Sequence, residues 1–272
     1  MSEKELLKAY HNQKFLDGPD ARMIRMMAEY LEPSARLRRQ QVKDAVVFFG
    51  SARSVPLAEA KKEWEAIQKR TRKRKLTEQD KKDRDRARRA LRMGEYYDTA
   101  RALARKLTEW TKGLPGNKKR FVVCTGGGPG MMEAANWGAA DAGGVSIGLN
   151  ISLPFEQEPN PHITDLLSFE FHYFFMRKFW FMYLARAMVI MPGGFGTLDE
   201  FMEVLTMVQT RKLKKKLPVV LIGSQYWNEV VDFEALVQWG TISPEDLDLF
   251  RLTDDADDAF DYLKAELTRN YL

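Results

Sequence analysis

The chain has 272 residues and a mass of 31.4 kDa, with 44% hydrophobic and 30% charged residues, the composition of an ordinary soluble globular protein. It contains no run near the roughly 18 apolar residues of a membrane-spanning helix, and its start lacks the apolar core of a secretion signal, so we expect a cytoplasmic protein with no membrane partner. Residues 61–92 hold 15 Lys or Arg and 6 Asp or Glu, which leaves 28 against 32 elsewhere and excludes a uniformly basic nucleic-acid-binding domain, but not a basic appendage.

Residues 1–43 are expected to form a helical extension ahead of the main domain at 44–272. Apolar residues recur there at helical spacing, namely Met23, Met26, Met27, Tyr30 and Leu31. We expect Pro33 to interrupt this helix, because proline has no backbone N–H to donate.

Six short apolar runs are predicted to be strands. In chain order they are 45–49, 121–124, 145–149, a region near 169–175, 187–191 and 218–222. They are apolar throughout, as expected for strands covered on both faces. Helical patterns follow at 95–112, 130–142, 174–185, 197–210, 226–239 and 254–269. This alternation predicts an α/β fold with a doubly wound parallel sheet, whose ligands bind where the strands end.

Residues 58–94 depart from this alternation. They are predicted to form an inserted hairpin of two charged helices, broken near Leu76, with Thr77 and Asp80 spaced as a capping pair for the second helix. Apolar residues are too sparse for deep packing, so a solvated hairpin is the favoured interpretation. The alternative is a docking arm for nucleic acid or an acidic partner, and the interspersed acidic residues disfavour nucleic acid.

Two glycine clusters follow strands at places where a helix begins. The first comprises Gly126, Gly127, Gly128 and Gly130, and the second comprises Gly193, Gly194 and Gly196 with the hydroxyl of Thr197. Glycine lets backbone N–H groups approach an anion closely, and a helix start attracts phosphate. Neither cluster continues as a Walker loop, and the strand after the first lacks the acidic residue of a dinucleotide site. A nicotinamide cofactor is therefore disfavoured, and a single nucleotide phosphate is the predicted ligand.

Charged residues near the second cluster are the candidates for chemistry. Glu200 either caps its own helix, through its spacing from Thr197, or lies beside a bound sugar phosphate and stabilises a cationic sugar. Arg177 stands in the aromatic stretch 171–185, where it needs an anionic partner or must reach solvent. The same alternatives apply to Lys178.

Other residues are weaker candidates. Ser51 and Arg53 follow the first strand and suit phosphate or ribose contacts, although serine is common in turns. Glu156, in the loop after the third strand, either binds ribose hydroxyls or is simply solvated. Cys124 is predicted to be a core residue. With one cysteine, and with His11, His162 and His172 scattered, we expect no disulfide and no metal.

Several motifs stand in a fixed order along the chain: FGSAR at 49–53, GGGPGMMEAAN at 126–136, GLNISLP at 148–154, Met176–Lys178 and PGGFGTLDE at 192–200. The last matches the signature PGGxGTxxE. Through these motifs the sequence resembles the LOG (Lonely Guy) family of cytokinin-riboside 5′-monophosphate phosphoribohydrolases, often mislabelled lysine decarboxylases. The resemblance spans about 45–55 and 95–240, and the extension and insertion depart from the family's short form.

This resemblance implies a Rossmann-like fold, a homodimer or higher homo-oligomer, and neither metal nor organic cofactor. It also implies hydrolysis of the N-glycosidic bond of a nucleoside 5′-monophosphate, either a cytokinin riboside monophosphate or AMP, to free base and ribose 5-phosphate. By the motif match, Arg177 and Glu200 would be the catalytic pair. The phosphate would be held by Gly193, Gly194, Gly196 and Thr197, and the nucleotide site would be lined by Lys178, Glu156 and Thr206. Phe175 stands where the family commonly has histidine.

Loss of the base builds positive charge on the sugar, which Glu200 is placed to stabilise. We expect Arg177 to bridge phosphate and carboxylate and to lower the pKa of Glu200. The sequence assigns no acid that protonates the departing base. One alternative is a non-catalytic nucleotide- or cofactor-binding carrier or sensor with the same loops, and another is a nucleic-acid-associated protein that acts through residues 61–92. Lysine decarboxylation is disfavoured, because no lysine has the context of a pyridoxal phosphate Schiff base.

Overall fold

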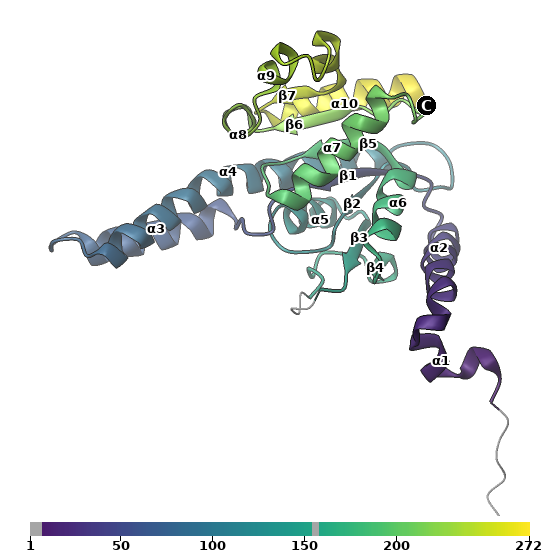
Figure 1. Cartoon of the computed structure of the whole chain (residues 1–272). Coiled ribbons are helices and arrows are strands. Elements are labelled where there is room, and N and C mark those ends of the chain that lie inside the picture. Colours follow the sequence, from purple (N-terminus) through teal and green to yellow (C-terminus); the bar gives the residue numbers. More distant parts are fainter. Residues whose placement is uncertain (1–6, 154–157) are drawn as a thin grey trace, which may run out of the picture.

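The computed structural model describes residues 7–153 and 158–272 (Figure 1). One sheet of seven parallel strands has the order β4-β3-β2-β1-β5-β6-β7. The strands are β1 (Ala45–Phe49), β2 (Val122–Thr125), β3 (Ser146–Ile151), β4 (Ser168–Phe171), β5 (Ala185–Ile190), β6 (Val219–Ile222) and β7 (Arg251–Thr253). The strand order reverses direction at β1, which pairs with both β2 and β5. The predicted doubly wound, Rossmann-like sheet is confirmed.

The helices alternate with these strands. They are α1 (Gln13–Asp17), α2 (Arg22–Arg39), α3 (Leu57–Thr71), α4 (Glu78–Lys112), α5 (Met131–Asp141), α6 (Phe174–Leu184), α7 (Phe195–Gln209), α8 (Ser224–Val230), α9 (Phe233–Gln238) and α10 (Ala256–Tyr271). In the described part of the chain, no helix is both long and apolar enough to cross a membrane.

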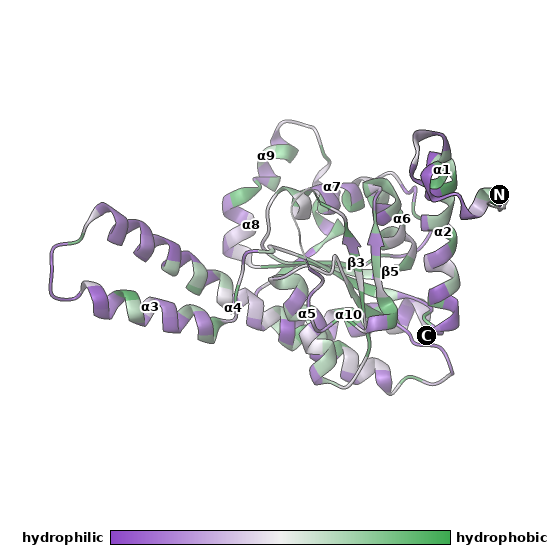
Figure 2. Ribbon diagram, turned by 90° about the horizontal axis from the view of Figure 1, so that it is seen from below, coloured by the Kyte–Doolittle hydropathy of each residue, from purple (hydrophilic) through white to green (hydrophobic). Residues whose placement is uncertain are grey.

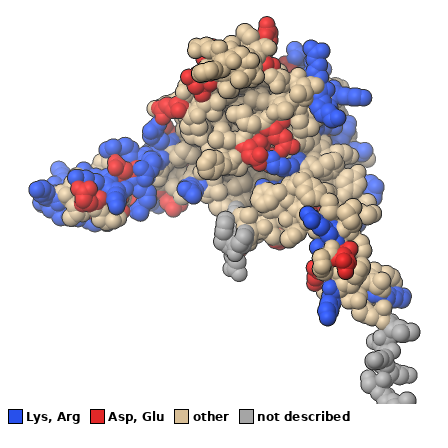
Figure 3. All heavy atoms as spheres, in the orientation of Figure 1, with Lys and Arg blue, Asp and Glu red and all other residues tan. Residues whose placement is uncertain are grey.

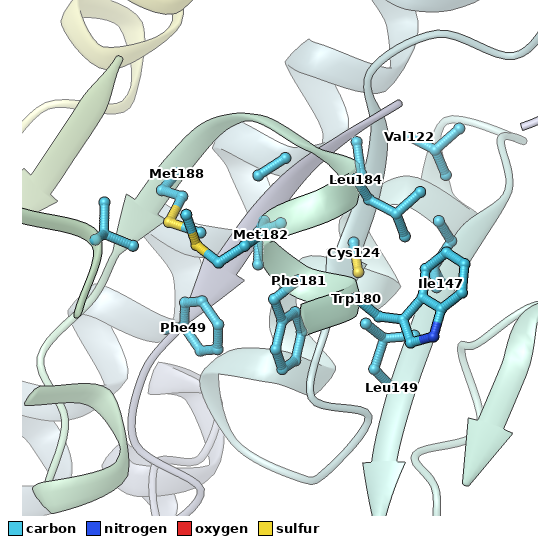
Figure 4. Close-up of a cluster of buried hydrophobic side chains, with 14 of the residues drawn as sticks. Phe49, Val122, Cys124, Ile147, Leu149, Trp180, Phe181, Met182, Leu184 and Met188 are labelled. Atoms are coloured by element: carbon cyan, nitrogen blue, oxygen red, sulfur yellow. The ribbon is translucent and has the colours of Figure 1, made fainter. Parts of the chain in front are cut away.

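Helices cover both faces of the sheet because its central strands bury side chains in both directions. Val47 and Phe49 of β1 belong to a core with α6 and α7, whereas Val46 and Phe48 belong to a second core with α4, α5 and α10. Figure 4 shows the first core, where the rings of Phe49 and Phe181 lie 4.7 Å apart. The buried Cys124 belongs to this core, as the sequence predicts.

Two predicted elements had wrong boundaries, and one strand was missed. The strand near 169–175 ends at Phe171, and α6 follows. The predicted helix at 226–239 is two helices, because the chain leaves helical geometry after Val230 and the Asp232 side chain caps α9 by accepting from the Ala235 N–H at 2.9 Å. The edge strand β7 has only three residues and was not predicted. The domain division at residue 43 stays a prediction.

The helix α2 runs through Pro33 without a break, contrary to the prediction. A proline at this position leaves the carbonyl of Glu29 without its helical donor, and Trp180 Nε1 of α6 donates to that carbonyl at 2.9 Å. The Glu29 carboxylate accepts from the N–H groups of His172 and Tyr173 at 2.8 and 3.3 Å. These residues precede the first turn of α6, so α2 holds the start of that helix.

The charged hairpin is confirmed, and it projects from the sheet (Figures 1 and 2). The predicted capping box is present, with the Thr77 N–H donating to Asp80 at 2.9 Å. Hydrogen bonds from Thr77 lower the pKa of Asp80 to about 2. Ion pairs join Arg70 to Asp83 at 2.6 Å and Arg74 to Asp80 at 2.7 Å. Acidic residues thus hold the hairpin together, and Lys and Arg dominate its surface (Figure 3).

The second helix of the hairpin does not end where the insertion was predicted to end. The separate helix expected at 95–112 is the inner half of α4, a single helix of 35 residues that is roughly 50 Å long. Its inner half packs on α5 and α10, and its outer half forms the hairpin with α3. One helix of the hairpin therefore continues without a break into the core.

Candidate functional site

A cavity of about 1080 Å³ opens where β1, β2, β3 and β5 end. The loops after these strands, the start of α7 and one face of α4 line it. The structure brings together many of the predicted site residues here: Ser51, Arg53, Arg177, Gly193, Gly194, Gly196, Thr197 and Glu200. Both members of the predicted catalytic pair share the cavity with the second glycine cluster.

The second glycine cluster presents the start of α7 to the cavity. A Cβ on Gly193 would lie 2.1 Å from Thr197 Oγ1, so glycine is needed there for the turn to pack on the helix. The Tyr226 hydroxyl donates to the Gly193 carbonyl. At Gly194 and Gly196 no described atom lies within 4 Å of a Cβ position. The first N–H groups of a helix lack intrahelical partners, so this open start offers the cavity donors of the kind that bind a phosphate.

Glu200 does not cap its helix, which corrects one of the two interpretations of its spacing. The helix begins at Phe195 after the N-cap Gly194, and no side chain caps it. Glu200 is instead 3% exposed, and its Oε2 atom has no hydrogen-bond partner among the described residues. A buried carboxylate oxygen without a partner is costly, which is consistent with a ligand group completing this site.

Arg177 acts to lower the pKa of Glu200, as expected, but this effect does not keep the pKa low. Burial raises the pKa of Glu200 to about 7, although Lys178 and Arg177 oppose the shift. Burial likewise lowers the pKa of Arg177, whose buried Nε is also unpartnered among the described residues. Desolvation outweighs charge attraction here because no ion pair within 4.0 Å joins Arg177 to Glu200 in the described structure.

Lys178 and Thr206 do not line the cavity. The Lys178 ammonium lies behind Glu200, 2.7 Å from Asp199, 2.6 Å from Glu203 and 3.8 Å from Glu200 itself. Thr206 is exposed, and its hydroxyl donates to the Met202 carbonyl one turn earlier. The predicted roles of both residues in binding substrate stay predictions.

The first glycine cluster shapes its loop, and only Gly126 lines the cavity. The Gly127 N–H donates to Thr125 Oγ1 at 2.9 Å, and Asn160 Nδ2 donates to the carbonyls of Gly127 and Gly128 at 3.1 and 3.0 Å. Gly130 has φ +72°, and a Cβ there would lie 2.3 Å from the Ser51 carbonyl oxygen. These three glycines fold the loop against its neighbours. Glu156 lies outside the described residues.

Other lining residues were not among the candidates. Arg86, Arg89, Ala90 and Met93 come from α4, and Asn150 and Tyr226 come from β3 and α8. Asn150 lies within the GLNISLP motif, which could have identified it. The α4 residues share one helical face, but that signal has meaning only once the hairpin is known to continue a core helix. Within residues 7–153 and 158–272, no cluster of His, Cys, Asp or Glu is placed to hold a metal ion.

A family model described as "Possible lysine decarboxylase" matches residues 132–263. Among curated proteins, the pyrimidine/purine nucleotide 5′-monophosphate nucleosidase of Escherichia coli K12 is 32% identical over 117 residues, which cover 39% of this chain and 25% of that protein. The counterpart from Escherichia coli O157:H7 matches equally. The chain thus spans about a quarter of the length of the curated relatives it matches.

Solved structures also align with the chain, at low identity. The structural genomics target TM1055 is 18% identical with a TM-score of 0.49, covering 82% of this chain and 99% of its own. The molybdenum cofactor carrier protein of Chlamydomonas reinhardtii is 18% identical with a TM-score of 0.44, covering 84% and 99%. The span matched by the family model contains Arg177, Glu200 and the signature at 192–200, which are among the residues through which the sequence resembles the LOG family.

Proposed function

We propose that the protein hydrolyses the N-glycosidic bond of a nucleoside 5′-monophosphate. The observation that carries this proposal is the pairing, in one cavity, of an open helix start at Gly194 with the buried, unpartnered carboxylate oxygen of Glu200. The resemblance to the LOG family and the nucleosidase name of the curated relatives support the same reaction class.

In this proposal the 5′-phosphate binds the N–H groups at the start of α7, where the helix dipole favours an anion. That contact places the ribose beside Glu200, one turn and a half further along the helix. When the bond between C1′ and the base nitrogen breaks, positive charge develops on the ribose, and the Glu200 carboxylate stabilises it. Water adds its hydroxyl to C1′, and the base nitrogen gains the proton. Binding of the phosphate thereby holds the glycosidic bond in position for the reaction.

The cavity can also hold the base. Its volume of about 1080 Å³ is slightly above the usual range for small-molecule sites, about 300–1,000 Å³, and Met93, Met132 and Phe174 give it apolar walls. We propose a purine base, either adenine or prenylated adenine. Among the described lining residues none is a lysine, so the cavity offers no Schiff-base partner for amino-acid decarboxylation.

The direct test is turnover of AMP and of prenylated AMP by the purified protein, with free base and ribose 5-phosphate both quantified. Stoichiometric release of the two products is the expected result. The better of the two substrates identifies the base. If the folded protein retains nucleotide tightly and releases neither product, the carrier or sensor alternative replaces the hydrolase.

The cytoplasmic location and the absence of a cofactor stay predictions.

The phosphate subsite makes a sharper prediction through Gly194→Ala. The backbone at Gly194 is extended, and the added methyl group meets no described atom within 4 Å, so the melting temperature should stay unchanged. The methyl group projects into the proposed phosphate position, and we expect KM for AMP to rise at least tenfold. Hydrolysis of adenosine, which has no phosphate, serves as the control and should not change. An unaltered KM for AMP would place the phosphate elsewhere.

We also propose a homodimer, through an exposed apolar face shared by α2 and α6. Its members are Met23, Met27, Tyr30, Leu31, Phe175, Phe179 and Tyr183. The rings of Tyr30 and Phe179 lie 5.5 Å apart, which joins the two helices into one patch. Light scattering should give twice the chain mass for the wild type and the single mass for Phe179→Glu. Trp239→Glu, at an exposed apolar residue after α9, should remain dimeric. A monomeric wild type contradicts the proposal.

A further inference from the structure

The base of the charged hairpin forms one wall of the cavity. Arg86, Arg89, Ala90 and Met93 of α4 all line it, and their spacing places them on one helical face. The hairpin therefore reaches the candidate site, although most of its length projects away from the sheet (Figure 1).

This wall makes the cavity strongly positive. Arg53, Arg86, Arg89 and Arg177 line it, whereas Glu200 is the one carboxylate among the described lining residues. Arg86 forms ion pairs with Glu63 at 2.9 Å and with Asp83 at 3.8 Å, which partly neutralise its charge. In the described part of the chain, neither Arg53 nor Arg89 has an ion pair within 4.0 Å, in contrast to their neighbours Arg88 and Arg92. Their guanidinium groups are therefore available to an anionic ligand.

One phosphate does not account for both positive regions. The start of α7 belongs to the helix layer on one face of the sheet, and α4 belongs to the layer on the other face, so the two positive regions come from opposite sides of the cavity. A phosphate seated at Gly194 leaves the α4 wall unoccupied. The two phosphorus atoms of a 5′-diphosphate are adjacent, so such a ligand does not span the two regions either.

We propose that Arg53, Arg86 and Arg89 form a second phosphate subsite, and that the preferred ligand is a nucleoside bisphosphate with one phosphate at the 5′ position and the other at 2′ or 3′. The planar guanidinium fork suits a phosphate monoester, which it binds through paired hydrogen bonds. The nucleotide nature of this ligand rests on the proposed function, whereas the second anion rests on the α4 wall alone.

The test measures binding to the Glu200→Gln variant by calorimetry, so that turnover does not interfere. Adenosine 3′,5′-bisphosphate and adenosine 2′,5′-bisphosphate are compared with AMP and ADP at low and at moderate salt. We expect at least one bisphosphate to bind about tenfold more tightly than AMP or ADP, with a preference that falls as salt rises. Equal affinities for all four ligands would overturn the proposal.

Arg89→Ala and Arg88→Ala, each added to Glu200→Gln, form a matched pair. Both remove one exposed arginine from the same turn of α4, but Arg88 does not line the cavity. Arg89→Ala should reduce the preference for the bisphosphate about tenfold, and Arg88→Ala should retain it. If both variants lose the preference for the bisphosphate equally, the proposed subsite is wrong. The preference would then come from the total positive charge of the hairpin, as expected for a nucleic-acid-binding arm. Thermal melting checks that both variants fold.

The two proposals fail separately. If the wild type hydrolyses AMP but the bisphosphates bind no better than AMP, the second subsite is wrong and the hydrolase stands. If no nucleotide is hydrolysed while Arg89 still controls bisphosphate affinity, the hydrolase is wrong and the subsite stands.

Discussion

Glu200→Gln is expected to lower kcat for AMP by about a thousandfold while leaving the Kd for AMP within a few-fold of the wild type. Glutamine keeps the shape of the side chain but removes the negative charge that faces the developing sugar cation, and charge stabilisation of this kind contributes about 10²–10³ in rate. Single-turnover measurement of kcat and calorimetric measurement of Kd separate the two effects. A variant with wild-type kcat would show that Glu200 takes no part in the reaction.

The same substitution makes a prediction about pH, because the pKa of Glu200 is raised from 4.5 to about 7 in the folded protein. The folded state holds this proton more tightly than the unfolded state, so stability falls as pH rises from about 4.5 to about 7 and stays lower above it. The loss is about 3 kcal/mol. Glu200→Gln removes it, and should therefore raise the melting temperature at pH 8 relative to the wild type, with a smaller difference at pH 5.

The pH dependence of wild-type activity follows from the same group. The ionised carboxylate is the form that stabilises a cation, so kcat/KM, which reports the free enzyme, should rise with pH and level off above about 7. A profile that levels off near pH 4.5 would contradict the buried, raised pKa.

Gly130→Ala is expected to cost about 3–5 kcal/mol of stability and to abolish activity. The residue has φ +72°, which strains any side chain, and the new methyl group would lie 2.3 Å from the Ser51 carbonyl oxygen and 2.8 Å from the Ala52 carbonyl carbon. Backbone atoms cannot rotate away, so the loop that carries Ser51 and Arg53 must move. Thermal melting and AMP turnover measure the two effects, and the melting temperature should fall by roughly 10 °C.

Gly240→Ala is the matched control for backbone strain. Gly240 has φ +66°, but no described atom lies within 4 Å of its Cβ position. It should cost only the strain of the left-handed conformation, about 1 kcal/mol, and leave activity intact. If the two substitutions lower stability and activity equally, the close contact between Gly130 and the Ser51 loop is not the reason that a glycine is needed at position 130.

Local patterns predicted the parts of the fold that are governed by neighbouring residues. Buried apolar runs gave the six longer strands, and the spacing of Thr77 and Asp80 gave the cap of α4. The signature loop led to Glu200, and the aromatic stretch with the motif at 176–178 led to Arg177; the structure places both residues in one cavity. Strand β7 escaped prediction because its three residues are too few to show a pattern.

Features that depend on distant residues could not be predicted in this way. The helix through Pro33 exists because Trp180, 147 positions later, donates to the carbonyl that the proline leaves free. The pKa of Glu200 follows from burial rather than from its charged neighbours, and burial depends on the assembled fold. Arg89 was not a candidate because the hairpin was expected to be separate from the core helix.

The unbroken α4 restricts how the length of the chain can change. Each residue added to a helix rotates everything beyond it by 100°. An insertion beyond Arg86 lengthens the tip and leaves the cavity wall in place. An insertion between Gly94 and the packed inner half rotates Arg86 and Arg89 about the helix axis, so that they no longer face the cavity. Relatives that carry such an arm should therefore differ in the length of the hairpin at its outer end, but should have the same number of residues between the packed part of α4 and the cavity wall.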